Sequence, residues 1–532
     1  DLESDACGVG LVAAIDGKPS RRVVEAGIEA LKAVWHRGAV DADGKTGDGA
    51  GIHLDLPVAF FHDAIDRAGQ RPRPNLLAVG MVFMPRTDLA AQESCRSIVE
   101  AEIIAEGHFI YGWRQVPVDV SVIGTKAQSL RPDIEQIMIA GPADTSEAAR
   151  DAFEKQLYIL RRRIEKKVIE AQIQGFYICS LSSRSIIYKG LFLAESLSLF
   201  YPDLTDERFE SRCAIYHQRY STNTFPQWWL AQPFRCLAHN GEINTIRGNT
   251  NWMKSHEIKM AATAFGDHSE DIKPLIPAGS SDTAALDAVF EAIVRSGRDA
   301  PTAKTMLVPE AWAKDADMPT AHKSMYAYFA SVMEPWDGPA ALAMTDGRWV
   351  CGGLDRNGLR PMRYVVTGDN LLIAGSEVGM VPVDETGVRT YQVINLNTGD
   401  NHYGFNSTQY GYELTATGMQ HDIGFLIHDT GGNDTIDFSG WDTPSIIDLN
   451  EGAFSSGGGV IEFPSLEEVN ANRAALGFAP RTQATYDLYI SLFAEPIDLG
   501  GTAGHRPGLP ATDLQLRHRP SRRRSEHQHP VH

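Results

Sequence analysis

The chain has 532 residues, of which 43% are hydrophobic and 22% are charged, and its formal net charge at pH 7 is −19. This length allows large buried cores and suggests two to four domains. The acidic balance argues against a nucleic-acid-binding protein, which normally carries a basic surface. No apolar run approaches the roughly 20 residues that a membrane span needs. We therefore expect a soluble cytoplasmic protein with neither a nucleic acid nor a membrane as partner.

The cysteines are sparse and form no CxxC pair; they stand at positions 7, 95, 179, 213, 236 and 351. This spacing predicts reduced thiols and excludes a zinc ribbon or a dithiol redox motif. His256 and Glu257 resemble the start of an HExxH zinc helix, but Met260 stands where the second histidine is required, so we predict no metal there. Because the sequence begins with Asp1 rather than Met, we interpret it as processed or partial.

Residues 1 to about 386 have the pattern of one continuous unit of strands and helices. Apolar residues recur at three-to-four spacing in a charged stretch from 146 to 174, which predicts a long amphipathic helix. Two further helices are expected at 23–36 and 284–297. Strands are expected at 7–15, 176–183, 185–192, 212–221, 338–347, 348–355, 360–368 and 370–377. Runs of strands separated by helices predict an α+β fold built of packed antiparallel sheets and helices.

The composition changes after residue 386. From Thr390 to Asn472 there is no Lys or Arg, whereas Asp, Gly, Asn and Thr are frequent. We expect a β-rich segment over 387–465 and a partly helical one over 466–504. Residues 505–532 are rich in Arg, His and Pro with few core-forming residues, which predicts a disordered basic tail.

Cys7 is a candidate nucleophile. A catalytic thiol needs a base and donors for an oxyanion. The α-amine of the same residue can be that base, because α-amines titrate at about 7.7–8.0 and thiols at about 8.5. This requires Cys7 to become the first residue, so we predict that residues 1–6 are a removable leader. Taken alone, Cys7 is better explained as a small buried thiol beside glycines.

Three other segments favour catalysis. The run HRGAVDADGKTGDGAGI (36–52) can wrap a small polar substrate. In HQRYSTNT, Arg219 can bind a carboxylate with two hydrogen bonds. In LAHNGEINT, Asn240 and Gly241 can supply a side-chain amide and a backbone N–H to an oxyanion. Asp282, in GSSDTAALDAV, can meet an ammonium group. Together with Cys7, these residues supply a candidate partner for every polar group of L-glutamine.

Residues 7 to about 386 resemble the glutaminase domain of glutamate synthase large subunits, which are class II (N-terminal-nucleophile) glutamine amidotransferases. The motifs that carry the resemblance are CGVG, HRGA…DGKTGDGAG, HQRYSTNT, LAHNGEINT, MEPWDGPA, LDRNGLRPMRY and SEVG. The resemblance implies a four-layer αββα N-terminal-nucleophile hydrolase fold.

The resemblance also implies residue roles. Cys7 would attack the glutamine side-chain amide to form a thioester, with Asn240 and Gly241 as the oxyanion hole. Arg219 would bind the α-carboxylate and Asp282 the α-ammonium. Thr222 and Asn223 would shape the pocket floor. Arg37 would orient the amino terminus, or equally well be a structural arginine that satisfies loop carbonyls.

Full-length members of this family add an FMN-binding synthase domain with an iron–sulfur cluster, and they work with a small NAD(P)H-oxidising subunit or ferredoxin. These regions are not in this sequence, and no cysteine follows Cys351. We therefore expect no cofactor in this chain and only the glutaminase half-reaction of glutamate biosynthesis. Two alternatives stay open: another class II amidotransferase, or a non-catalytic scaffold if Cys7 is not made N-terminal.

Residues from about 390 to 460 resemble the C-terminal segment of serralysin-type metalloproteases. GGNDTIDFS (431–439) approximates their calcium-binding nonapeptide, which makes Asp434 and Asp437 weak calcium candidates. One repeat is too few for a stable β-roll, which needs about three. We predict a junction near residues 385–389, either an assembly artefact or a fused interaction module.

Overall fold

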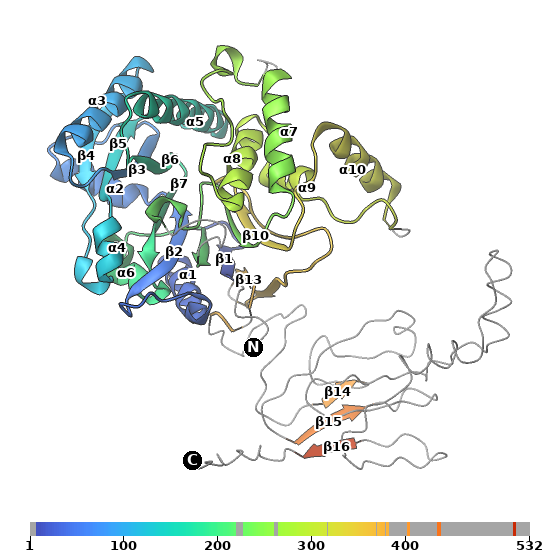
Figure 1. The fold of residues 1–532 in the computed structure, drawn as a ribbon. Coiled ribbons are helices and arrows are strands. Elements are labelled where there is room, and N and C mark those ends of the chain that lie inside the picture. Colours follow the sequence, from blue (N-terminus) through green and yellow to red (C-terminus); the bar gives the residue numbers. More distant parts are fainter. Residues whose placement is uncertain are drawn as a thin grey trace, which may run out of the picture. The chain divides into compact units, whose positions relative to one another are not determined.

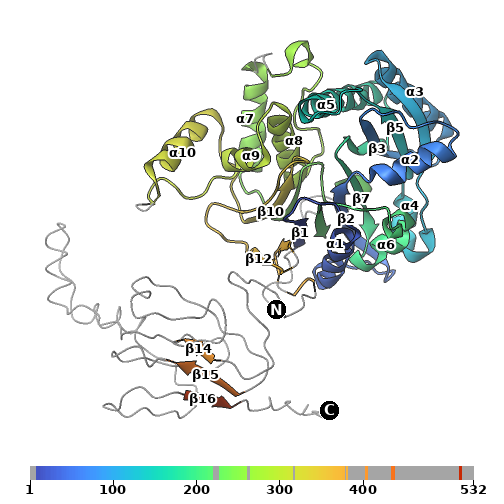
Figure 2. The same cartoon turned by 180° about the vertical axis from the view of Figure 1, so that it is seen from behind.

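The computed structural model describes residues 7–219, 227–259, 264–315, 318–368, 370–377 and 379–381, together with three short strands at 402–404, 433–437 and 514–517. The chain divides into two compact units, Asp1–Val393 and Ile394–His532. The first unit is a mixture of helices and sheets (Figures 1 and 2).

The largest sheet of the first unit has six strands, and all neighbouring strands in it are antiparallel. Their order across the sheet is β12 (Arg363–Val366), β13 (Leu371–Gly375), β1 (Gly8–Ala14), β8 (Cys213–Gln218), β2 (Thr46–Asp55) and β7 (Ser185–Phe192). In this register Gly8 lies opposite Gln218. Cys7, directly before β1, is therefore brought to the end of β8, where Arg219 follows.

A three-stranded sheet packs against the first one. Its order is β11 (Val350–Leu354), β10 (Ala340–Thr345) and β9 (Leu237–Gly241). Val9, Leu11 and Ile215 of the large sheet form one buried cluster with alanines of the small sheet, among them Ala238 and Ala341. Small side chains on one face let the two sheets approach closely, which brings β9 near the start of β1.

Helices cover the outer faces of these two sheets. Helix α1 (Arg21–Ala33) packs on β1 and β8. Helix α8 (Asp282–Arg295) and helix α9 (Ala300–Leu307) share a buried cluster with β9 and β10. Figures 1 and 2 both show α1 on one side of β1 and β10, and α8 on the other.

A four-stranded sheet forms the remaining part of the core. Its order is β4 (Phe109–Gln115), β5 (Asp133–Ala140), β3 (Leu77–Met84) and β6 (Tyr177–Ser182). It shares a buried cluster with α3 (Leu89–Ala105) and α5 (Glu147–Glu170). Helix α5 confirms the amphipathic helix predicted at 146–174. It begins where the Ser146 hydroxyl accepts the Ala149 N–H, at 3.3 Å.

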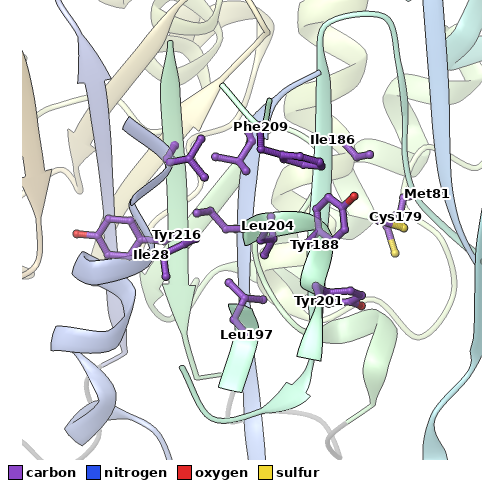
Figure 3. Packing of buried hydrophobic residues seen from close by; sticks show 14 of the residues in the cluster. Ile28, Met81, Cys179, Ile186, Tyr188, Leu197, Tyr201, Leu204, Phe209 and Tyr216 are labelled. Atoms are coloured by element: carbon purple, nitrogen blue, oxygen red, sulfur yellow. The ribbon is translucent and has the colours of Figure 1, made fainter. Parts of the chain in front are cut away.

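Aromatic side chains fill the space beside β7 (Figure 3). The rings of Tyr188 and Tyr201 meet edge-on, with centroids 5.0 Å apart. The Tyr188 hydroxyl donates to Asp203 Oδ2 (3.0 Å) and accepts from Gln136 Nε2 (3.0 Å). Because its polar end is satisfied, this fully buried tyrosine incurs no unpaired-hydroxyl penalty.

The other helices are shorter or lie at the periphery. They are α2 (Val58–Arg67), α4 (Thr125–Leu130), α6 (Leu197–Phe200), α7 (Ile246–Lys259) and α10 (Thr320–Val332). The 3₁₀ turns are η1 (Trp35–Arg37), η2 (Val120–Val122), η3 (Ala194–Ser196), η4 (Pro202–Thr205), η5 (Trp228–Leu230) and η6 (Gly266–His268). The helix predicted at 23–36 ends early, since α1 stops at Ala33 and η1 follows. Within the described residues, no helix has both the length and the apolar character needed to cross a bilayer.

The second unit contains one described sheet, in the order β14 (His402–Gly404), β15 (Asn433–Asp437) and β16 (Leu514–Arg517). Strand β16 lies in the tail that we predicted to be disordered, so that prediction is wrong for these four residues. The prediction of disorder rested on overall composition and overlooked a local strand pattern, in which Leu514 and Leu516 alternate with polar residues. These two residues pair antiparallel with β15. The rest of the tail and the segment predicted as partly helical (466–504) lie outside the described residues.

Candidate active site

The backbone of Cys7 is bound by the side chain of Asn240. Cys7 N–H donates to Asn240 Oδ1 (3.2 Å), and Asn240 Nδ2 donates to the Cys7 carbonyl oxygen (2.6 Å). Both residues are buried. The pairing follows from the fold, because β9 carries Asn240 in the small sheet and β1 begins right after Cys7 in the large one.

Gly241 ends β9 in a conformation that requires glycine. Its φ is +133°, in a region that L side chains rarely adopt. A Cβ there would lie 1.8 Å from the carbonyl oxygen of Pro339, which is the residue before β10. The backbone around Gly241 is therefore held close to the neighbouring chain, and no side chain fits there.

Charged groups of both signs surround the Cys7 thiol. Burial raises the pKa of this thiol to about 12; the positive charges of Arg219 and Arg360 oppose the rise, and the negative charges of Asp48 and Asp282 add to it. At neutral pH the sulfur is therefore protonated, and a thiolate forms only if a base accepts its proton.

Arg219 directly follows β8 and is held by residues near the start of β2. Its φ of +89° is unusual for a residue other than glycine, and such strain costs about 1–3 kcal/mol. Its N–H donates to the Gly49 carbonyl (2.8 Å), and its Nε lies 3.5 Å from Asp48 Oδ2. Asp48 Oδ1 accepts the Ala39 N–H (3.1 Å), and burial raises the pKa of Asp48 to about 6.

Asp282 is the first residue of α8, and only 4% of its surface is exposed. Its Oδ2 accepts the N–H of Ile243 (3.0 Å), and its Oδ1 accepts the N–H of Thr283 (2.8 Å). The carboxylate is thus fixed between the start of α8 and the turn that follows β9.

Arg37 lies in η1, and its Nε pairs with Glu377 Oε1. The other oxygen of Glu377 is 2.9 Å from His36 Nε2. Glu377 follows β13, which is the other neighbour of β1. This pair with a carboxylate decides neither of the two roles that the sequence left open for Arg37, which stay predictions.

The structure does not describe the side chains of the remaining predicted site residues. Thr222 and Asn223 lie outside the described residues. Asp434 and Asp437 belong to β15 of the second unit, and their side chains are also outside the description. Within the part of the chain that is described, no group of three or more His, Cys, Asp and Glu side chains is arranged to hold a metal.

Several residues near Cys7 were missed by sequence reasoning. Asp48 and Arg360 stand in the quoted motifs, but no local pattern separates them from their neighbours. Gln218 precedes Arg219 and is fully buried; within the described residues neither of its side-chain polar atoms has a hydrogen-bond partner. A Cβ on Gly38 would come within 2.0 Å of Gln218 Nε2, so this amide packs against the turn that contains Arg37.

Comparisons with known proteins match two parts of the chain to two families. Residues 7–399 match the family of class II glutamine amidotransferases, and residues 393–477 match the C-terminal region of the serralysin peptidases (family M10). Both resemblances inferred from the motifs are confirmed. The two matched ranges meet at residues 393–399, close to the predicted junction.

Similar proteins are large chains of glutamate synthase. The NADPH-dependent chain of Azospirillum brasilense is 66% identical over 386 residues, which cover 73% of this chain and 25% of that one. The NADPH-dependent chain of Bacillus subtilis is 42% identical, with the same coverage of both chains. The ferredoxin-dependent synthase 1 of Arabidopsis thaliana is 43% identical and is covered over 24% of its length.

The chain thus spans about a quarter of the length of the curated relatives that it matches. A solved glutamine phosphoribosylpyrophosphate amidotransferase from B. subtilis aligns with 40% of this chain and 42% of its own, at 19% identity and a TM-score of 0.22, which is too low to support an argument. The family match alone covers well over half of the residues. The chain belongs to the class II glutamine amidotransferases.

Proposed function

We propose that this chain hydrolyses L-glutamine to glutamate and ammonia, the glutaminase half-reaction of glutamate synthase, with Cys7 as nucleophile. The observation that carries the proposal is the contact of Asn240 with both the nitrogen and the carbonyl oxygen of Cys7. In this buried contact, the Cys7 nitrogen that would act as the base is bound by Asn240, the residue predicted to stabilise the oxyanion.

The base is the α-amine that Cys7 acquires once the peptide bond to Ala6 is cleaved. Cys7 N–H already donates to Asn240 Oδ1, so the freed amine has an acceptor that directs its remaining lone pair. A base is required because burial keeps the thiol protonated. An α-amine that titrates at about 7.7–8.0 is neutral often enough near pH 7.5 to accept the proton.

The reaction then proceeds in two displacements. The Cys7 sulfur attacks the amide carbon of glutamine while its proton moves to the α-amine, and the carbonyl oxygen becomes an oxyanion. Asn240 Nδ2 donates one of its two hydrogens to Cys7, so the second can reach this oxyanion, together with the backbone N–H of Gly241. The amine returns the proton to the departing ammonia. Water then attacks the thioester, which releases glutamate and restores the thiol.

The charged groups near the thiol match the rest of the substrate. Arg219 binds the α-carboxylate, and Asp282 binds the α-ammonium. Each is set in place by its surroundings, Arg219 by Gly49 and Asp48, and Asp282 by two backbone N–H groups. Thr222 and Asn223 complete the pocket floor in this proposal.

We assign the amidotransferase to residues 7–386 and give it the four-layer αββα arrangement of N-terminal-nucleophile hydrolases. The packing of α1, the two facing sheets and α8 supports this assignment. Residues 387–465 are proposed as a separate serralysin-like segment, with Asp434 and Asp437 as weak calcium candidates.

In longer chains of this type, the ammonia would pass to 2-oxoglutarate in a synthase domain with FMN and an iron–sulfur cluster. The names of the relatives include NADPH-dependent and ferredoxin-dependent enzymes, so the electron donor would be a small NAD(P)H-oxidising subunit or ferredoxin. We place the reaction in the cytoplasm, in keeping with the acidic net charge of −19.

A matched pair of chains tests the proposal. One chain begins at Cys7 and ends at His532; the other retains residues 1–6 with Ala6 fixed by a protease-resistant bond. We expect glutaminase activity from the first and none from the second. Intact mass spectrometry verifies each amino terminus before the assay.

Labelling with a diazoketone analogue of glutamine gives an independent readout. The adduct is expected on Cys7 and on none of the other five cysteines, of which Cys95, Cys179 and Cys236 are buried. Cys7→Ala must abolish both labelling and hydrolysis, whereas Cys351→Ala must leave them intact. An unlabelled, inactive chain that begins at Cys7 contradicts the proposal.

A further inference from the structure

Besides the two N–H groups that bind the Asp282 carboxylate, a third group, the Thr283 hydroxyl, contacts it. Thr283 Oγ1 lies 3.4 Å from Asp282 Oδ1, the same oxygen that accepts the Thr283 N–H at 2.8 Å. Both residues are at the start of α8 and are almost fully buried. In such surroundings a carboxylate oxygen is sensitive to each donor around it, because water cannot replace one that is lost.

The Thr283 hydroxyl is itself held by His239. Thr283 Oγ1 lies 3.0 Å from His239 Nδ1, and only 1% of the histidine is exposed. Burial lowers the pKa of His239, so the ring is neutral at neutral pH. A neutral imidazole can orient a hydroxyl without adding a charge that would compete with a substrate ammonium for Asp282.

His239 is fixed on its strand as well. Its N–H donates to Gln232 Oε1 (2.8 Å), and its carbonyl oxygen lies 3.0 Å from His217 Nε2. Strand β9 is at the edge of its sheet, so these side chains satisfy backbone groups that have no neighbouring strand. The next residue on β9 is Asn240, which binds Cys7.

We infer that His239 and Thr283 are positioning residues that set the Asp282 carboxylate for the α-ammonium of glutamine, and that they determine selectivity for substrates with an α-amino group. The inference rests on the proposed glutaminase function. It adds that recognition of the ammonium is built from β9, the same strand that carries the oxyanion donors. Residues for substrate selection and for oxyanion stabilisation are therefore neighbours on the same strand, β9.

The test compares glutamine with glutaramate, which is glutamine without the α-amino group, in the chain from Cys7 to His532. In Thr283→Val the hydroxyl is lost and the side-chain shape is kept. We expect KM for glutamine to rise about tenfold, KM for glutaramate to stay the same, and kcat to change less than twofold. Thr283→Ser restores the hydroxyl and should recover most of the selectivity.

Two further sets of variants guard against indirect effects. Thr305→Val makes the same replacement in α9, where the hydroxyl donates to Pro301 O (2.8 Å), and must not change selectivity. His239→Asn keeps a polar atom near the position of Nδ1, whereas His239→Leu does not. The asparagine variant should retain more selectivity than the leucine variant, which provides the answer if Thr283→Val does not fold.

The outcomes separate this inference from the proposed function. If the unmodified chain hydrolyses glutamine but Thr283→Val and His239→Leu keep its preference over glutaramate, the positioning role is wrong and the glutaminase function stands. Equal rises in both KM values reject the positioning role as well, because they indicate a general distortion. If the unmodified chain has no glutaminase activity, the proposed function fails and the inference fails with it.

Discussion

Asn240 binds both ends of the Cys7 backbone unit, with Oδ1 at 3.2 Å from the nitrogen and Nδ2 at 2.6 Å from the carbonyl oxygen. One amide therefore holds both the nitrogen and the carbonyl oxygen of the nucleophile's own residue. In the proposed mechanism this nitrogen is the base, and Asn240 Nδ2 is a donor to the oxyanion. A change at Asn240 should for this reason affect bond breaking more than substrate binding.

Asn240→Asp tests this division. The carboxylate keeps the shape of the side chain but removes the N–H donors and places a negative charge where an oxyanion forms. We expect kcat to fall by about 10²–10³, the usual loss for one oxyanion donor, while KM changes by less than about threefold. Steady-state kinetics with glutamine measure both. Asn75→Asp is the control, since Asn75 Nδ2 donates to Gly141 O (2.7 Å) in a distant loop. A large rise in KM with unchanged kcat would assign Asn240 to binding instead.

Gly241→Ala should destabilise the fold. The new Cβ would meet the Pro339 carbonyl oxygen at 1.8 Å in a backbone with φ of +133°, so either β9 or the segment before β10 must shift. We expect a loss of about 2 kcal/mol or more in the free energy of unfolding, measured with urea. Gly248→Ala in α7 is the matched control, because nothing lies within 4 Å of its Cβ and alanine favours a helix. Equal stabilities of the two variants would contradict the close approach at Gly241.

Asp48 should make stability depend on pH in an unusual direction. Burial raises its pKa to about 6 in the folded chain, whereas an unfolded aspartate titrates at about 3.9. Between these values the folded state holds a proton that the unfolded state has lost, so this group's contribution falls as the pH rises from 4 to 6. Asp48→Asn removes the effect. The unfolding free energy of Asp48→Asn minus that of the original chain should therefore be about 2 kcal/mol larger at pH 7.5 than at pH 4.5.

Asp43, in the turn just before β2, provides the opposite case. Hydrogen bonds from the Thr46 hydroxyl (2.6 Å) and the Thr46 N–H (2.7 Å) hold the pKa of its carboxyl well below its usual range. A carboxyl with a lowered pKa stabilises the fold above its unfolded pKa, and this stability is lost as the pH falls. Asp43→Asn should therefore be less stable than the original chain at pH 7.5, and the difference should shrink on acidification. If both variants respond alike, the burial of Asp48 does not control its titration.

The sequence alone predicted the parts of the site that have a distinct chemical role at a marked position. Four separate positions in the chain supply these residues, and each stands in a quoted motif: Cys7 before β1, Arg219 after β8, Asn240 in β9 and Asp282 at the start of α8. The long helix α5 was equally predictable, because its apolar spacing and its Ser146 cap are both local signals.

Asp48, Thr283 and His239 were not predictable in this way. Asp48 is one of three aspartates in the segment from 41 to 48, and only burial beside Arg219 distinguishes it. His239 and Thr283 adjoin predicted site residues, but their contact joins β9 to α8 across 44 positions. Such a contact depends on how the sheet and the helix pack, which no local pattern encodes.

Glu377 joins the segment after β13 to the turn that contains His36 and Arg37, and this contact gives the last prediction. In Glu377→Gln the charge is lost and the shape is kept, so the ion pair that fixes Arg37 in the turn packed against Gln218 is weakened. We expect kcat/KM for glutamine to fall about tenfold, which corresponds to about 1.4 kcal/mol, with little change in thermal stability. Glu334→Gln is the matched control, since Glu334 makes a similar pair with His256 Nε2 (2.7 Å) on α7. Equal kinetic effects of the two variants would reject a specific role for the Arg37 turn, whereas a selective loss in Glu377→Gln supports an Arg37 that is positioned by Glu377 for the nucleophile.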